Sequence, residues 1–287
     1  MPRSVLILGP TGRLGRNAAQ AFAAAGWSVT PFDRKTGNLM AEARGKDVIV
    51  NGWNPLYSDW QAQLPRLTEQ VQAAARASGA TIIQPGNVYV FGPGTPPPWS
   101  ARSPHAATNP LGRLRIDMES SYRASGLRTI LLRAGDFLDT EASGNWFDRV
   151  IAPKVHQGRF TWPGDPDVPH AWAFLPDLAR AMVCLAERAE SLPTYADIPF
   201  PGHTVTGREM ADHIARITGR KIRIKPFPWW TLHAAQPFWP MAKHMREMRY
   251  LWTTPHWLDG TDFRALCPDC PDTPLDDALR QAIEPFR

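Results

Sequence analysis

The stretch VLILGPTGRLGRNAAQAF, Val5 to Phe22, decides the fold of this chain. It opens with an apolar run typical of a buried strand, which ends at Gly9. Glycines then recur every third residue, at Gly9, Gly12 and Gly15, and an amphipathic helical pattern follows at once. A strand, a glycine-rich turn and a helix in direct succession predict the first unit of a parallel α/β sheet.

Each glycine of this turn has a separate physical task. Gly9 permits the tight turn, Gly12 lets a pyrophosphate approach the backbone, and Gly15 lets the helix pack closely on the strand. The amides at the start of the helix would then face the phosphates. The turn therefore predicts dinucleotide binding.

The alternation continues along the first 135 residues, where short apolar runs alternate with helical patterns. We predict helices after the first strand, around Leu67 to Ser78, and from Pro110 to Ser125. The predicted strands are Val5–Gly9, Ser28–Phe32, Asp47–Asn51, Thr81–Gln84 and Arg128–Arg133. This order predicts an α/β fold, a Rossmann-type doubly wound parallel sheet.

Composition changes after about residue 137, and most of the Trp, His and Met residues lie beyond this point. We predict a dinucleotide-binding domain over residues 1–160 and a smaller, mostly helical substrate cap over residues 161–287. The helix Leu178–Arg188, with Asp177 as its N-cap, is expected to pack back on the first domain. Further helices are expected at Gly207–Thr218, Trp229–Leu251 and Leu275–Ile283.

Bulk composition excludes several classes of protein. No apolar run approaches the roughly 20 residues of a membrane span, and the first apolar run is too short for a signal peptide, so a cytoplasmic location is expected. The net charge of +5 is spread along the chain, which favours a small-molecule substrate and neither nucleic acid nor membrane as partner. Cys184, Cys267 and Cys270 predict no disulfide framework and no metal site, and Cys267 and Cys270 are interpreted as loop thiols.

Several motifs together carry a resemblance to a known family. The GxxGxxG turn is followed by DVIVNGW, QPGNVYVFG, NPLGRLRIDME, LRAGDF and WPGDPDVPHAWAFLPDLARAM in the expected order. In these motifs the chain resembles the extended and atypical branch of the short-chain dehydrogenases/reductases, the NAD-dependent epimerase/dehydratase-like proteins. The resemblance covers nearly the whole chain, implies the same sheet and cap, and leaves a homodimer open.

The resemblance and the turn together imply a set of cofactor-binding residues. They are Gly9, Thr11, Gly12, Arg13, Leu14, Gly15, Asp33, Arg34, Asn51, Gly52, Trp53, Pro85, Gly86, Arg115, Ala134 and Gly135. Asp33, at the end of the second strand, would bond the ribose hydroxyls of NAD, whereas Arg34 and Arg13 would pair with the 2′-phosphate of NADP. We predict NADP, with NAD as the alternative.

The helix from Pro110 departs from the family pattern at its most important position. In the family, a tyrosine and a lysine four residues apart handle the proton and the nicotinamide ribose, and a hydroxyl residue orients the carbonyl. The matching positions here are Leu111, Arg115 and Asn87. Leucine transfers no proton, and an arginine is a poor acid.

A displaced proton donor is one explanation of this departure. Candidates are Tyr89, Asp136, His156 and His170, and we place Asn87, Arg115 and Tyr89 in the catalytic set. The others are a substrate that needs no protein acid and a chain that only binds the cofactor.

These features predict an NADPH-dependent oxidoreductase acting on a small or medium organic substrate. Candidate substrate neighbours are Trp99, Asp136, His170 and Trp172. The alternatives are a nucleotide-sugar epimerase or dehydratase and a non-catalytic NADP(H) sensor.

Overall fold

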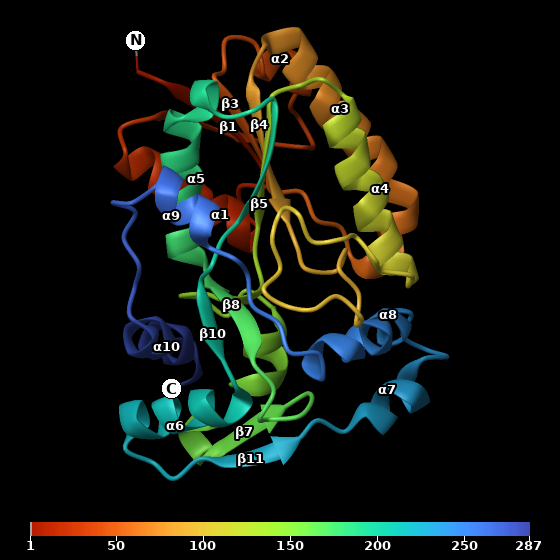
Figure 1. Ribbon diagram of the computed structural model, residues 1–287, viewed down its shortest axis with the longest axis vertical. Helices are drawn as coiled ribbons and strands as arrows, with labels where there is room; N and C mark the ends of the chain where they lie inside the picture. The colour runs from red at the N-terminus through yellow and green to blue at the C-terminus, as the bar shows by residue number, and fades with distance from the viewer. Residues whose placement is uncertain (1) are drawn as a thin grey trace.

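A six-stranded parallel sheet forms the centre of the computed structural model, which describes residues 2–287 (Figure 1). Its strand order is β2-β1-β3-β4-β5-β9. The strands are β1 (Ser4–Leu8), β2 (Ser28–Phe32), β3 (Val48–Asn51), β4 (Thr81–Gly86), β5 (Thr129–Arg133) and β9 (Tyr195–Pro199). The predicted strands and the doubly wound fold class are confirmed, and β9 is an additional strand.

Helices cover both faces of the sheet. Figure 1 shows α1 (Arg13–Ala24), α5 (Leu175–Glu187) and α9 (Thr261–Leu266) on one face. The other face carries α2 (Leu39–Glu42), α3 (Trp60–Ser78) and α4 (Pro110–Ala124). Alternate residues of β1 pack in the two cores on either side of the sheet. Val5 and Ile7 lie on the α1 and α5 side, whereas Leu6 and Leu8 pack against α3 and α4. Both faces of this strand are buried, which explains its continuous apolar sequence.

The sheet reverses its direction of growth at β1. The chain passes from β1 to β2 on one side and then to β3 on the other, and β1 pairs with both. In open α/β sheets, ligands bind outside the carboxyl ends of the strands at such a switch point. The glycine turn after β1 and Gly52 after β3 lie at this switch point, and we call the space in front of them the crevice.

The cap is mixed rather than mostly helical. Strands β6 (Asp136–Leu138), β8 (His170–Phe174) and β10 (His203–Val205) form one small sheet, and β7 (Arg159–Trp162) pairs with β11 (Arg223–Pro226). The cap helices are α6 (Gly207–Thr218), α7 (Trp229–Ala235), α8 (Met241–Glu247) and α10 (Leu275–Ile283). Single helical turns complete the chain at η1 (Tyr57–Asp59), η2 (Phe147–Ile151), η3 (Val155–Gln157), η4 (Ala189–Ser191), η5 (Met248–Trp252) and η6 (Glu284–Phe286).

Two predicted boundaries in the cap region need correction. The predicted helix Trp229–Leu251 is divided into α7, α8 and η5, because Pro237 and Pro240 interrupt its backbone hydrogen bonding. The predicted division at residue 160 also fails to follow the packing. Leu138 and Phe147 already belong to the cap core, whereas β9 returns to the central sheet.

The start of α5 differs from the prediction. The helix begins at Leu175, so Asp177 lies within its first turn and is not the N-cap. Its carboxylate accepts hydrogen bonds from the Thr273 amide at 2.9 Å and the Thr273 hydroxyl at 2.7 Å, and it also pairs with Arg180. Asp177 therefore ties the C-terminal segment to α5.

The cysteine prediction is wrong. Cys184 on α5 and Cys267 after α9 form a disulfide, with Cα atoms 6.2 Å apart, and Cys270 remains a free thiol. The CxxC at Cys267 and Cys270 is interpreted from sequence as two loop thiols, whereas the packing of α9 beside α5 brings together two cysteines 83 positions apart. The bridge holds the C-terminal segment on the same helix that Asp177 anchors.

A buried cation joins the strands to α4. Arg133 on β5 is fully buried and pairs with Glu119 on α4 and Asp197 on β9, both at 2.7 Å. It also donates to the Asn87 carbonyl oxygen at 2.6 Å. Burial alone would lower the pKa of Arg133, but the two carboxylates outweigh it and raise the pKa above its usual range. His105, Glu119 and Asp197 are close enough to suggest a metal site, but the guanidinium already supplies the cation there.

Within residues 2–287, no helix is both long and apolar enough to cross a membrane.

Removing Arg133 should destabilise the fold strongly. We expect Arg133→Met to cost about 3–5 kcal/mol of unfolding free energy, because it leaves two buried carboxylates without their cation. The matched control Arg76→Met, at an exposed arginine on α3, should change stability by less than about 0.5 kcal/mol. Urea denaturation measures both, and equal costs would contradict the role of Arg133.

Candidate functional site

The glycine turn has the geometry of a phosphate cradle. Gly9 has a φ of +69°, a conformation that other residues rarely adopt, and a Cβ atom there would lie 3.1 Å from the Gly52 carbonyl oxygen. A Cβ atom on Gly15 would overlap the Gly9 carbonyl oxygen, and one on Gly52 would overlap that of Leu8. The close approach of β1, β3 and α1 at this turn therefore requires glycine at all three positions.

The start of α1 is free to receive an anion. Gly12 is the N-cap, so no side chain caps the helix, and its first turn contains no acidic residue. The first amides of a helix have no partner within the helix and carry partial positive charge. Thr11 is exposed beside this turn, whereas Leu14 is buried beneath it.

Arg13 points from the turn toward the cap. Its guanidinium donates to the Ser143 carbonyl oxygen at 2.9 Å, and its charge acts on Tyr57 and Asp148. This position differs from the predicted pairing with a 2′-phosphate beside Arg34. The reason is that Arg13 begins α1, and its side chain reaches across the crevice rather than along β2.

The end of β2 carries the residues predicted to select the cofactor. The Asp33 carboxylate accepts hydrogen bonds from the Lys35 amide and the Thr36 hydroxyl, both at 2.8 Å. These bonds, the Lys35 amide first, lower the pKa of Asp33. Arg34 lies over the Trp53 ring, 5.8 Å from its centroid, and shares a hollow of about 510 Å³ with Arg66 of α3. Two arginines therefore meet beside the predicted ribose position.

The remaining predicted cofactor residues lie at the carboxyl ends of neighbouring strands. Asn51 is buried, and its amide donates to the Gln84 side chain at 2.7 Å, so this side chain holds β3 to β4 rather than facing a ligand. Gly86 packs against β5, and Gly135 lies against the Ala171 backbone. Pro85 is partly buried next to Gly86, and Ala134 is buried next to Gly135.

Leu111 and Arg115 lie one turn apart on α4, at the positions that the resemblance matched to a tyrosine and a lysine. Leu111 is 1% exposed and packs in an apolar cluster with Tyr89 and Trp60. The Arg115 guanidinium lies over the Trp60 ring, 4.3 Å from its centroid, and donates to Asn54 at 3.3 Å. The position that should donate a proton is therefore part of the core.

Arg115 is a buried cation with incomplete pairing. Among the described residues it forms no ion pair within 4 Å, and its Nε has no hydrogen-bond partner. Burial lowers the pKa of its guanidinium. Because a buried charge without a carboxylate is costly, this side chain is suited to an electron-rich ligand.

Two tyrosines meet beside this arginine. The hydroxyls of Tyr89, two residues after Asn87, and Tyr57 of η1 lie 2.6 Å apart. Burial raises the pKa of both side chains, and the charges of Asp136 and Arg115 act on both. Asn87 itself accepts the Tyr89 amide at 3.0 Å and so shapes the loop that carries Tyr89.

Sequence reasoning missed Tyr57, Trp60 and Arg66. Tyr57 and Trp60 lie in YSDW, just before the α3 pattern, where no motif marks them. Their aromatic character between a strand and a helix is the one available signal, and it does not separate a site from a core.

A second polar cluster lies on the cap side of the crevice. His170 Nε2 lies 2.7 Å from an Asp136 carboxylate oxygen, and its ring stacks on Trp252 with centroids 4.3 Å apart. His256 packs against His170, and burial together with the charge of His170 holds the pKa of His256 well below its usual range. Asp136 is the partly exposed member, whereas both histidines are buried.

Two predicted substrate neighbours are core residues. Trp99 is fully buried, stacks on His256 and donates its indole N–H to the Thr95 carbonyl oxygen at 2.9 Å. Trp172 is 1% exposed among the aromatic rings of the cap. His156, a candidate proton donor, lies instead against the end of α10, where its Nε2 is 3.2 Å from the Ile283 carbonyl oxygen. None of these three side chains faces the crevice.

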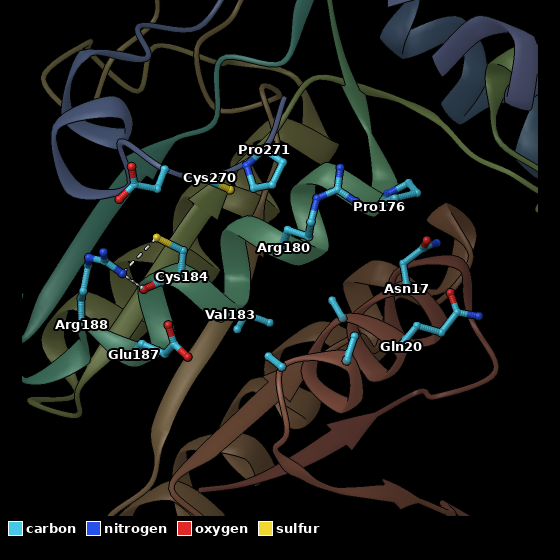
Figure 2. A pocket seen from close by; sticks show the side chains of 14 residues that line it. Asn17, Gln20, Pro176, Arg180, Val183, Cys184, Glu187, Arg188, Cys270 and Pro271 are labelled. Atoms are coloured by element: carbon cyan, nitrogen blue, oxygen red, sulfur yellow. Dashed lines mark hydrogen bonds between the residues drawn. The ribbon is translucent and has the colours of Figure 1, made fainter. Parts of the chain in front are cut away.

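A larger hollow of about 570 Å³ lies elsewhere, between α1 and α5 (Figure 2). Its arginines are already engaged. Arg180 pairs with Asp177, and Figure 2 shows Arg188 donating to the carbonyl oxygen and the sulfur of Cys184. This hollow lies along the helices rather than at the carboxyl ends of the strands, so it is separate from the glycine turn.

No family model and no curated protein matches this chain. Solved structures do. MoeE5 in complex with UDP-glucose and NAD is 15% identical, with a TM-score of 0.74 over 98% of this chain and 97% of that one. UDP-glucuronic acid 4-epimerase from Bacillus cereus, in complex with NAD, is 14% identical, with a TM-score of 0.73 over 99% and 98%.

A reductase has the same fold. dTDP-4-dehydrorhamnose reductase from Clostridium acetobutylicum is 15% identical, with a TM-score of 0.68 over 98% of both chains. The chain therefore has the fold of nucleotide-sugar epimerases and related reductases, which confirms the resemblance to the extended short-chain branch at the level of the fold. Because this fold carries both reactions, the choice between them rests on the site.

Arg115 and Leu111 should separate ligand binding from packing. Arg115→Ala should weaken NADPH binding by about tenfold or more, because a hydrogen bond from a charged donor is lost. Arg115→Lys should recover part of that loss. Leu111→Ala should instead cost about 2–5 kcal/mol of stability and leave affinity unchanged. Calorimetric titration and thermal unfolding measure the two effects, and unchanged affinity in Arg115→Ala would refute the placement of Arg115 beside the cofactor.

Proposed function

We propose that this chain is an NADP(H)-dependent oxidoreductase that acts on a carbonyl or hydroxyl group of a small or medium organic substrate. The observation that carries the proposal is the glycine turn, where three chain segments approach so closely that only glycine fits, in front of an uncapped helix start. The backbone amides there can bind a pyrophosphate without a competing carboxylate. The NAD complexes of proteins with the same fold support this interpretation.

The corner after β2 favours NADP over NAD. Arg34 and Arg66 line one hollow, and neither forms an ion pair within the described part of the chain. The Asp33 carboxylate is engaged by Lys35 and Thr36, which leaves it less available for ribose hydroxyls. Two free guanidinium groups suit a 2′-phosphate, which they can bind bidentately. The similar MoeE5 and Bacillus cereus epimerase structures contain NAD, so the preference for NADP in this chain rests on the two arginines.

The proton donor in this proposal is Tyr89. When bound, the nicotinamide supplies the hydride. As the substrate carbonyl carbon accepts it, the carbonyl oxygen takes a proton from the Tyr89 hydroxyl. Tyr57 passes its own proton to Tyr89 across their 2.6 Å contact, and the Tyr57 tyrosinate, which is only partly buried, then regains a proton from solvent. The charge of Arg115 stabilises the transient tyrosinate. This arrangement supplies from a loop the proton that Leu111 cannot supply from α4.

In this proposal Asp136, which is partly exposed and whose charge acts on Tyr57 and Tyr89, holds the substrate. Its carboxylate can accept hydrogen bonds from substrate hydroxyls, and His170 fixes its orientation. His170 is a positioning residue, because it is buried and stacked on Trp252.

A nucleotide-sugar epimerase is the second candidate. The similar structures favour it, since several of them are sugar-nucleotide epimerases, and this chain matches them over nearly their whole length. It demands a proton acceptor and donor at one carbon, which the Tyr57 and Tyr89 pair would also have to provide. A chain that binds NADP(H) without turnover is the third outcome.

Labelled cofactor distinguishes these candidates. We expect 4-deuterated NADPH to transfer its label to a carbonyl product during a screen of carbonyl compounds and sugar nucleotides. Tyr89→Phe should lower kcat by about a hundredfold or more, with NADPH affinity unchanged, because general acid catalysis is lost. Tyr195→Phe, at a partly buried tyrosine at the amino end of β9, is the matched control, because its hydroxyl has no hydrogen-bond partner in the described structure.

The pH profile gives an independent check of the donor. Because burial raises the pKa of Tyr89 and Tyr57, both hydroxyls stay protonated beyond the pH at which a free tyrosine ionises. The enzymatic rate is therefore expected to fall with deprotonation of these hydroxyls only as pH rises above the usual tyrosine range. Inversion of a sugar without net oxidation of the cofactor would support the epimerase. Tight binding of NADPH with neither label transfer nor inversion would contradict both enzymatic candidates.

Cofactor selection should depend on the two arginines of the hollow. Arg34→Ala and Arg66→Ala should each weaken NADPH binding by about tenfold or more and leave NADH binding unchanged, because only NADPH carries the 2′-phosphate. Arg44→Ala, at an exposed arginine after α2, is the matched control. If the NADPH to NADH preference is the same in all three variants and the wild type, the assignment of NADP to this corner is wrong.

A further inference from the structure

The positive charge of the chain is concentrated in one part of the cap. Residues 220–249 contain seven of the 32 Lys and Arg residues and one of the 27 Asp and Glu residues, Glu247. The remaining chain therefore has 25 cations and 26 carboxylates and is close to neutral. Glu247 is itself engaged, because its carboxylate accepts hydrogen bonds from Asn109 and the Leu111 amide. The whole net charge thus comes from this segment.

The side chains of β11 and the residues before it separate by face. Lys221, Arg223 and Lys225 are exposed, whereas the intervening Ile222 and Ile224 pack against the cap core. This alternation follows the period of two of an extended chain. The outer face of the segment is therefore entirely basic.

Arg159 on the neighbouring strand β7 adds to the positive charge of this face. Arg159 on β7 is exposed and lies directly opposite Arg223 in the parallel register. Like charges opposite each other destabilise a sheet. None of Arg159, Lys221, Arg223 and Lys225 forms an ion pair with a carboxylate of residues 2–287. The face thus carries unpaired positive charge that an external anion would neutralise.

Exposed aromatic rings follow immediately along the chain. Trp230 is 71% exposed, Phe238 91% and Trp239 42%. Phe238 and Trp239 lie in the turn between α7 and α8, flanked by Pro237 and Pro240, while Trp229 and Leu232 fill the core side of α7. Figure 1 shows β11 along the bottom of the molecule and α7, which follows it in the chain, at the lower right beside α8. Phe238 and Trp239 are adjacent in sequence, and exposed apolar side chains gathered in one place, rimmed by polar residues, mark interaction sites.

We propose that Arg159, Lys221, Arg223, Lys225, Trp230, Phe238 and Trp239 form a basic aromatic surface that docks on an anionic lipid bilayer. Basic side chains are attracted to anionic headgroups, and Trp and Phe prefer the boundary between headgroups and acyl chains. No membrane partner is expected from a positive charge spread along the chain. The excess lies instead in residues 220–249. The proposal concerns contact with a surface and is independent of the proposed activity.

Other occupants fit this surface less well. A second copy in a two-fold dimer would bring the same basic patch to both sides of one interface, and the repulsion between the two patches opposes association. A nucleic acid would need aromatic platforms within a basic groove, whereas Phe238 protrudes almost completely from a turn. A bilayer accepts a protruding ring and supplies the anions.

Sedimentation with vesicles tests the proposal on the full chain. We expect binding to vesicles of phosphatidylcholine with phosphatidylglycerol, weakening as salt rises, and little binding to phosphatidylcholine alone. The triple variant Lys221→Gln, Arg223→Gln, Lys225→Gln should bind about a hundredfold more weakly, since each basic residue near an anionic surface contributes about fivefold. High salt screens the basic residues, so the vesicle binding that the wild type keeps at high salt comes from the aromatic rings. The double variant Phe238→Ser, Trp239→Ser should lose this remaining binding.

A charge-matched control distinguishes this surface from net charge. Arg44, Arg76 and Arg123 are exposed and lie next to the amino ends of β3, β4 and β5, away from the cap. Changing these three to Gln should leave vesicle binding nearly intact. Equal losses in the two triple variants, or no binding of the wild type to anionic vesicles, would overturn the proposal. So would retention of an oligonucleotide, or concentration-dependent dimerisation, through these residues without vesicle binding.

Discussion

The buried ion cluster around Arg133 is the constraint on which the site depends. One guanidinium on β5 holds Glu119 of α4, Asp197 of β9 and the Asn87 carbonyl oxygen. Because a buried charge keeps its partners at hydrogen-bond distance, these contacts fix the position of α4 relative to the strand ends. Arg115 lies one turn before Glu119 on α4, and Tyr89 lies two residues after Asn87. The same cation therefore orients both the helix and the loop that form the site.

This arrangement gives the loss of the helix tyrosine a physical meaning. Leu111 completes an apolar cluster with Trp60 and Tyr89, and the proton-bearing groups are the hydroxyls of Tyr89 and Tyr57 in the adjoining loops. Arg115 keeps a positive charge at the family's lysine position but stacks on Trp60, which is better suited to a planar guanidinium than to an ammonium group. The charges of Arg115 and Asp136 both act on this hydroxyl pair, so a cation, two hydroxyls and a carboxylate lie near one another.

The central sheet was predictable because its signals are local. The apolar runs of β1 to β5 and the glycines between them depend on near neighbours in sequence, so strand positions and the dinucleotide turn followed directly. The cap was less predictable. Its boundary, the division of the Trp229–Leu251 helix and the role of Asp177 depend on contacts with distant segments. Trp99 and Trp172 resemble pocket residues in sequence, yet the aromatic packing of the cap buries both.

The sequence by itself determined the doubly wound sheet, the glycine turn after β1 and the absence of a titratable side chain at Leu111, because each depends on residue type and spacing along one short segment. Tertiary structure alone decided that Tyr57 meets Tyr89, that Cys184 pairs with Cys267, and that Arg34 shares a hollow with Arg66. These pairs come from separate elements, and only the packing of helices on the sheet sets the distances between them.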